Sequence, residues 1–204
     1  MFALVLFHDR RPGTDPAVTA GERAALRTHL AAVPALIEAL IYTPAEARDT
    51  YTDDGAAPPL GMQLHFARLE ELEAAAGRGG ALQALPALLP SLAGTVATAQ
   101  AFWRRTWPVP DPAVRPEPGA LPCSFVVHYP GPAEDFNAWL DHYIAGHPPL
   151  FQRFPGIRAI EILTRVDWVN HLPYAKADHM QRNRVMFDSP AALTAALQSP
   201  VRHE

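Results

Sequence analysis

The chain has 204 residues, of which 49% are apolar, so it is long enough to bury a sizeable core, which argues against wholesale disorder. Its net charge of −4 and its pI near 6.1 leave no basic excess for neutralising phosphates, which argues against a nucleic-acid partner. The single cysteine, Cys123, cannot form an internal disulfide, and this favours a reducing compartment such as the cytoplasm.

The first segment, FALVLFH (2–8), predicts a β-strand because β-branched and aromatic residues dominate it. It lacks the basic start and the small-residue cleavage site of a secretory signal. A helix is expected over 17–31 and a second strand over 33–43. No apolar run approaches the roughly 20 residues that a membrane span needs, so we expect no membrane partner.

After an excursion over 44–61 the pattern predicts a third strand, a helix that starts near Leu69, and a further strand over 95–107. Prolines then cluster in PVPDPAVRPEPGALP (108–122), a composition typical of an extended linker. The predicted organisation is therefore an N-terminal domain at 1–107, a linker at 108–122 and a C-terminal domain at 123–204.

The two halves align without gaps when one is shifted by 121 residues. FALVLFH then falls on CSFVVHY (123–129), and MQLHFARLEELEAA falls on NRVMFDSPAALTAA. The alignment also places Pro34 on Pro155 and Phe66 on Phe187. We interpret the chain as a tandem duplication of one β–α–β–β–α unit, against the alternative of two unrelated segments of similar composition.

In the second half a helix is expected over 134–152, where Tyr143 and His147 lie one turn apart on one stripe. Pro148 and Pro149 are expected to end this helix, because proline lacks an N–H. Pro155-Gly156 then predicts the turn into the next strand.

A second excursion over 165–181 leads to a third strand, and DSPAAL predicts a capped helix that starts near Pro190. No counterpart of the strand at 95–107 follows. The sequence leaves open whether the chain is truncated there or whether that sheet edge is short or covered by other means.

The repeat singles out His147 as the candidate catalytic residue. It aligns with Leu26, and Tyr143 aligns with Glu22, so the fold itself requires neither side chain. An imidazole titrates near neutral pH, so a half-buried His147 can accept or donate a proton. Tyr143 is expected beside it as a hydrogen-bond donor, or else as a core aromatic residue.

The second half also resembles a known family. The pattern F-x-x-W-L-x-x-Y-I-x-x-H-P-P-L-x-x-x-F-P-G-I-R over 136–158, followed by FDSPAAL over 187–193, is similar to the signature of EthD-like proteins. This resemblance covers most of 123–200, whereas the first half matches only in outline. The family belongs to the ferredoxin-like dimeric α/β-barrel superfamily.

The resemblance implies an α+β fold of two tandem ferredoxin-like repeats, whose antiparallel sheets pack as an α/β barrel with the helices outside. It also implies a ligand pocket between helices and sheet, with His147 in it and no cofactor. The remaining expected ligand contacts are Tyr143, Phe125, Val127, Tyr129, Phe151, His171 and Arg184.

Other signals are weaker. The loop 170–184 offers a candidate lid, against the alternative of a solvated loop. His171 and His179 are eight residues apart without nearby cysteines, which argues against zinc. Cys123 is expected to be buried and inert.

The leading functional hypothesis is an EthD-like protein that handles a small organic metabolite, as an isomerase, dehydratase or degradation enzyme without a cofactor. The alternatives are a non-catalytic binding or accessory protein and an oligomerising scaffold. The two repeats would form an internal pseudo-dimer, and a homodimer is left open.

Overall fold

The computed structural model describes residues 1–51 and 55–203. The chain divides into two compact units. Unit 1 comprises Met1–Pro44, Pro58–Arg104 and Arg165–Asp178, and unit 2 comprises Ala45–Ala57, Arg105–Thr164 and His179–Glu204. Each unit therefore takes in one segment, 165–178 or 45–57, that lies in the opposite half of the sequence.

Unit 1 contains an antiparallel sheet with the strand order β2-β3-β1-β4. Its strands are β1 (Phe2–Asp9), β2 (Leu36–Tyr42), β3 (Leu60–Phe66) and β4 (Val96–Trp107), with the short strand β7 (Ala175–Lys176) pairing parallel to β4. The strand that the sequence predicts over 95–107 is thus confirmed as β4, and it pairs with β1.

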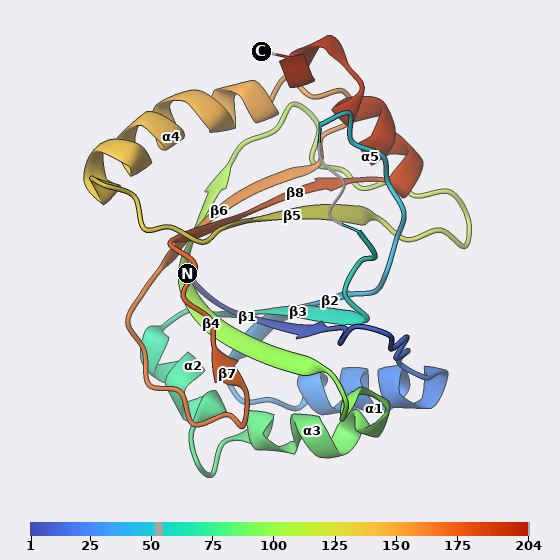
Figure 1. The fold of residues 1–204 in the computed structure, drawn as a ribbon, viewed down its shortest axis with the longest axis vertical. Coiled ribbons are helices and arrows are strands. Elements are labelled where there is room, and N and C mark those ends of the chain that lie inside the picture. Colours follow the sequence, from blue (N-terminus) through green and yellow to red (C-terminus); the bar gives the residue numbers. More distant parts are fainter. Residues whose placement is uncertain (52–54, 204) are drawn as a thin grey trace. The chain divides into compact units, whose positions relative to one another are not determined.

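The helices of unit 1 cover one face of this sheet (Figure 1). They are α1 (Ala20–Ala31), α2 (Leu69–Ala76) and α3 (Leu85–Leu88), with the 3-10 turns η1 (Ala81–Ala84) and η2 (Pro90–Leu92) beside them. Helix α1 begins at a capping box, in which the Thr19 hydroxyl accepts from the Glu22 amide and the Glu22 carboxylate accepts from the Thr19 amide. The core of unit 1 consists mainly of buried leucines from its helices and its sheet.

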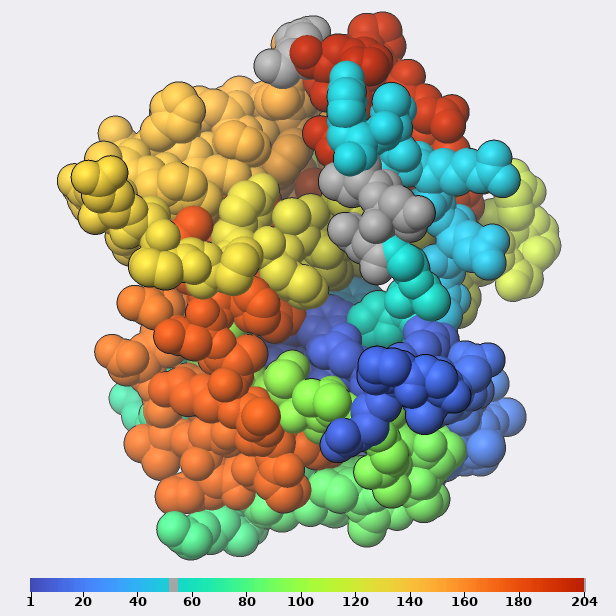
Figure 2. Space-filling view, in the orientation of Figure 1, coloured from blue at the N-terminus to red at the C-terminus, as the bar shows by residue number. Residues whose placement is uncertain are grey.

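The segment 165–178 completes unit 1, although it lies beyond the linker in the sequence. Its side chains Trp168, Leu172 and Tyr174 belong to the core cluster of unit 1. The Glu73 carboxylate accepts from the amide of Val169 at 2.8 Å. Figure 2 shows the segment in orange as a broad patch on the surface of this unit. The candidate lid over 170–184 is therefore not one continuous loop. Its residues up to Asp178 pack on unit 1, and most of its remaining residues belong to the strand β8.

Unit 2 has the strand order β6-β8-β5, again antiparallel, with its two helices on one face of the sheet (Figure 1). Its elements are β5 (Cys123–Tyr129), α4 (Phe136–Phe151), β6 (Ala159–Arg165), β8 (Gln181–Phe187), α5 (Pro190–Leu197) and η3 (Pro200–His203). Ser189 caps α5 by accepting from the Ala192 amide at 3.1 Å, with Pro190 as first residue, as the sequence predicts.

The strand registers of the two units agree under the shift of 121 residues. Phe2 pairs with Phe66 in unit 1, and Cys123 pairs with Phe187 in unit 2. The agreement extends to the neighbouring strands, since the pairing of Ala39 with Leu64 corresponds to that of Ile160 with Val185. The predicted α+β class is confirmed, and each unit is an antiparallel sheet with helices on one face.

The turn before the second strand of each unit needs a left-handed backbone. Gly156 has a φ of 76°, and Ala35, its counterpart 121 residues earlier, has a φ of 60°. A residue with a Cβ is strained in this region, whereas glycine is not. The turn predicted at Pro155-Gly156 is thus confirmed, and unit 1 adopts it with a less suitable residue.

The prediction that Pro148 and Pro149 end the helix is wrong. Helix α4 continues to Phe151, with both prolines inside its last turn. Each proline removes its own N–H bond, yet the helical turn closes because the Pro148 carbonyl still accepts from the amide of Gln152 at 3.0 Å. Among the described helices, none combines the length and the apolar character needed to cross a membrane.

Candidate functional site

The helix-covered face of the unit 2 sheet changes from apolar to polar along its strands. The registers place side chains of β6, β8 and β5 in rows across this face, because directly paired residues point the same way. Successive rows are Thr164, Gln181 and Tyr129; then Ile162, Asn183 and Val127; then Ile160, Val185 and Phe125. The polar end therefore lies where β5 ends and β8 begins.

Helix α4 places a series of rings over this face. Asp135 caps the helix by accepting from the Ala138 amide at 2.9 Å. The rings of Trp139 and Tyr143 stack with centroids 5.1 Å apart, and those of Tyr143 and His147 stack at 3.8 Å with an interplanar angle of 11°. Phe151 continues the series edge-on to His147 at 5.9 Å. The stripe predicted for Tyr143 and His147 thus exists, and with Trp139 and Phe151 it forms an aromatic ladder of Trp139, Tyr143, His147 and Phe151.

A hydrogen-bonded network joins the ladder to the sheet. Gln181 Nε2 donates to Asn183 Oδ1 at 2.9 Å, and Asn183 Nδ2 donates to the hydroxyls of Tyr143 and Tyr129. The two hydroxyls lie 3.0 Å apart and bond to each other. Burial raises the pKa of Tyr143 far above its ordinary value, so its hydroxyl stays protonated and can donate.

His147 is held neutral at neutral pH. Burial is the main cause that lowers its pKa below the ordinary value, the nearby charge of His142 lowers it further, and a hydrogen bond to the backbone of Tyr143 raises it. The side chain remains partly exposed. A neutral, accessible imidazole is suited to accepting a proton or a hydrogen bond from a ligand.

The interface between α4 and the sheet is less closed than the equivalent interface of unit 1. Three core positions of unit 1 are each 0% exposed, whereas their counterparts in unit 2 are partly exposed. One reason is that β5 lies at the end of its unit's strand order, whereas β1 lies between two strands. The positions are Leu4, Leu6 and Leu26 in unit 1, and Phe125, Val127 and His147 in unit 2.

The structure brings most of the predicted site residues together. His147, Tyr143, Tyr129, Phe125, Val127 and Phe151 all belong to this face of unit 2 or to α4 above it. Arg184 points to the opposite face of the sheet, where its Nη1 donates to Glu161 Oε1 at 2.9 Å and its Nε donates to Ser124 Oγ. His171 lies in unit 1, where its carbonyl accepts from Gln83 Nε2 at 2.9 Å.

Sequence reasoning missed the two buried amides, Gln181 and Asn183. They are 0% and 2% exposed, and they lie in the middle of the network. The repeat contained the signal, because the same positions in unit 1 are Leu60 and Met62, both fully buried. Two amides in place of two apolar side chains indicate a face with a role beyond packing.

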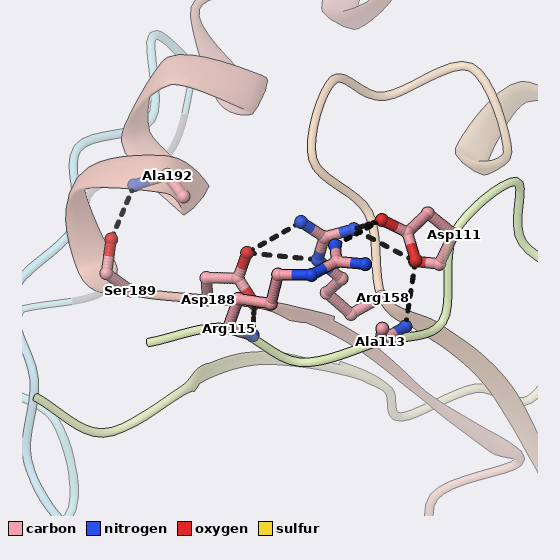
Figure 3. Close-up of polar contacts among 7 residues, drawn as sticks. All are labelled: Asp111, Ala113, Arg115, Arg158, Asp188, Ser189 and Ala192. Atoms are coloured by element: carbon pink, nitrogen blue, oxygen red, sulfur yellow. Dashed lines mark hydrogen bonds and ion pairs between the residues drawn. The ribbon is translucent and has the colours of Figure 1, made fainter. Parts of the chain in front are cut away.

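Two residues of the EthD-like pattern, Arg158 and Asp188, form an ion pair away from the aromatic ladder. Arg158 of Phe-Pro-Gly-Ile-Arg donates through Nη2 to Asp188 Oδ2 at 2.7 Å and through Nη1 to Asp111 Oδ2 at 2.7 Å (Figure 3). The bonds from Arg158 lower the pKa of Asp188, and a bond from Arg115 lowers the pKa of Asp111 to about 2. Because Asp111 and Arg115 lie in the proline-rich stretch, the cluster fixes that stretch to unit 2.

Unit 1 also holds buried histidines, among them His8 and His65. His8 is 4% exposed, and its Nδ1 lies 2.9 Å from the Thr95 hydroxyl. Burial lowers the pKa of His8 to about 4, so it is neutral at physiological pH. In the part of the chain that the structure describes, no three histidine, cysteine or acidic side chains are grouped so that they could hold a metal ion.

Comparisons with known proteins identify the fold. No family model and no curated protein matches the chain. An anthrone oxidase-like protein of known structure matches with 15% identity and a TM-score of 0.53, and the match covers 100% of this chain and 79% of that protein's chain. A protein provisionally described as a chlorite dismutase matches with 13% identity and a TM-score of 0.51, and the match covers 99% of this chain and 87% of that protein's chain. At these identities the likeness shows the fold alone, which is a ferredoxin-like α+β fold.

Proposed function

We propose that the chain is an EthD-like protein that handles a small molecule, and that unit 2 binds a planar, oxygen-bearing organic metabolite between α4 and the sheet. The observation that carries this proposal is the partly open face of unit 2, where an aromatic ladder adjoins a network of buried amides and tyrosine hydroxyls. The corresponding face of unit 1 is closed by leucines.

The side chains of this face favour a planar ligand. Aromatic rings pack best against other flat apolar surfaces, with centroids about 4.5–7 Å apart. Tyr129, Trp139, Phe125 and Phe151 are partly exposed and offer such surfaces. The hydroxyls of the network supply hydrogen bonds for an oxygen atom of the ligand, which fixes its orientation.

His147 is the residue proposed to carry the chemistry. Its imidazole is neutral at neutral pH and can remove a proton from the bound metabolite, as an isomerase or dehydratase requires. The alternative is a binding protein without turnover, in which the stacked ring of His147 serves only as a wall of the site. The parallel stacking on Tyr143 is the observation that favours this alternative.

The duplication belongs to the same proposal. The agreement of both registers under a single shift supports one ancestral unit written twice, with domains at 1–107 and 123–204 around a linker at 108–122. In this view one copy kept a closed core, while the other acquired a site. A cytoplasmic location, with Cys123 as a reduced thiol, is also part of the proposal.

The proposal is tested by a search for bound ligands, followed by mapping of the binding site. Small molecules released by denaturing freshly purified protein would be identified by mass spectrometry, and 2-naphthol would be titrated as a planar probe by NMR. We expect chemical shift changes at the ladder and Tyr129, with His8 in unit 1 as an unaffected control. Changes confined to unit 1, or none at saturating probe, would contradict the proposed site.

A further inference from the structure

One polar atom of the network lacks a partner. Gln181 is 0% exposed, and its Oε1 has no hydrogen-bond partner among the described residues. Buried side-chain carbonyls are normally satisfied, because leaving one without a donor costs the desolvation of that group. The atom therefore calls for a donor that does not come from the protein.

The orientation of this amide is fixed by its neighbours. Gln181 Nε2 donates to Asn183 Oδ1 at 2.9 Å, and Asn183 in turn directs its Nδ2 to the hydroxyl of Tyr143. Rotating the Gln181 amide would bring two carbonyl oxygens together, unless Asn183 also turned and gave up its donation to Tyr143. The chain of bonds thus leaves an acceptor, and not a donor, at its end.

The position of this acceptor places it at the proposed site. Gln181 pairs directly with Tyr129, whose side chain is partly exposed and whose hydroxyl bonds to that of Tyr143. The same position in unit 1 is Leu60, which is 0% exposed, so the fold is compatible with an apolar side chain there. A glutamine that packing does not require, with a carbonyl that the protein does not satisfy, is explained by a bound donor.

We infer that Gln181 is a specificity-determining residue whose Oε1 accepts a hydrogen bond from a hydroxyl or N–H group of the ligand. This inference rests on the proposed ligand site. It narrows the ligand class to planar molecules that carry a donor, such as phenols, and it disfavours the corresponding ethers and ketones. Tyr129, which pairs with Gln181 across the two strands, can donate to a second oxygen of the same ligand.

The experiment compares two probes of nearly equal shape, 2-naphthol and 2-methoxynaphthalene, by calorimetric titration of the full chain. The wild type should bind the naphthol about tenfold more tightly, which corresponds to one net hydrogen bond. Gln181→Met, which keeps the length of the side chain but removes the carbonyl, should bind both probes with the affinity that the wild type shows for the ether. Val114→Met, an exposed change in the proline-rich stretch, is the control and should keep the tenfold ratio.

The possible results separate the two proposals. Equal binding of both probes by the wild type would overturn the role of Gln181 and leave the ligand site intact, as expected if a bound water satisfies Oε1. A preference for the ether, or a tenfold ratio that survives in Gln181→Met, would also overturn it. Binding of neither probe would contradict the ligand site, and the inference about Gln181 with it. Circular dichroism of each variant confirms that it is folded before its affinities are compared.

Discussion

Replacing His147 by leucine separates folding from function, because unit 1 already carries Leu26 at the equivalent position. The change removes the stack on Tyr143, which contributes about 0.5–1.5 kcal/mol. Leucine regains part of this by burying its own apolar surface, and no charge is lost because His147 is neutral at pH 7. We therefore expect His147→Leu to change the free energy of unfolding by at most about 1 kcal/mol, a Tm shift of about 2–4 °C.

The functional loss should be much larger if the residue transfers a proton. General acid–base catalysis contributes about 10²–10⁴-fold to a rate, whereas one lost hydrogen bond weakens binding only about tenfold. The assays are urea unfolding and, once a ligand is identified, affinity and turnover measured on the same samples. A variant that unfolds would show His147 to be structural, and one with unchanged affinity and turnover would place the site elsewhere.

Three further predictions follow from the described geometry. Ala35→Gly should stabilise the protein by about 0.5–1 kcal/mol and Gly156→Ala should destabilise it by a similar amount, because both residues have positive φ. No atom lies within 4 Å of the Cβ that Gly156 would gain, so the effect reports backbone strain alone. Thermal unfolding measures both variants, and Tm values equal to that of the wild type would refute the strain. The pKa of His8 falls from 6.5 to about 4 on folding, so stability should decline as the pH falls through this window, by about 2 kcal/mol between pH 7.5 and 5; His8→Gln should remove that part of the loss in urea unfolding, and an unchanged slope would contradict it. Burial raises the pKa of the Cys123 thiol, so disulfide reagents should label it slowly in the folded protein and rapidly in denaturant, with fast labelling in both states as the opposing result.

Local signals predicted most of the elements from the sequence. The cap at Ser189 and the left-handed turn at Gly156 are written in short patterns, and the structure has both. The error at Pro148 and Pro149 has a simple origin: each proline removes one N–H bond wherever it lies beyond the first turn, but near the C-terminal end of a helix, unlike in its middle, few residues follow whose bonds a kink would disturb. Propensity does not distinguish these cases unless the end of the helix is known.

Long-range placement accounts for what the sequence left undetermined at the site. The spacing of Tyr143 and His147 predicted that they share one helix face, and the structure stacks their rings. It did not reveal that Arg184 faces away from α4, because strand alternation assigns a side only after the register is known. The amide pair on β8 became evident only when its two residues were compared with Leu60 and Met62.

The segment 165–178 has a consequence for synthesis on the ribosome. Unit 1 depends on Trp168, Leu172 and Tyr174 for part of its core, yet these residues are made long after its four main strands. At about 5–20 residues per second, the roughly 70 residues from the end of β4 to Asp178 take about 4–14 s to add. During that interval the nascent first half presents an unfilled apolar surface, which makes it a substrate for chaperones and leaves a fragment cut at the proline-rich stretch prone to aggregate.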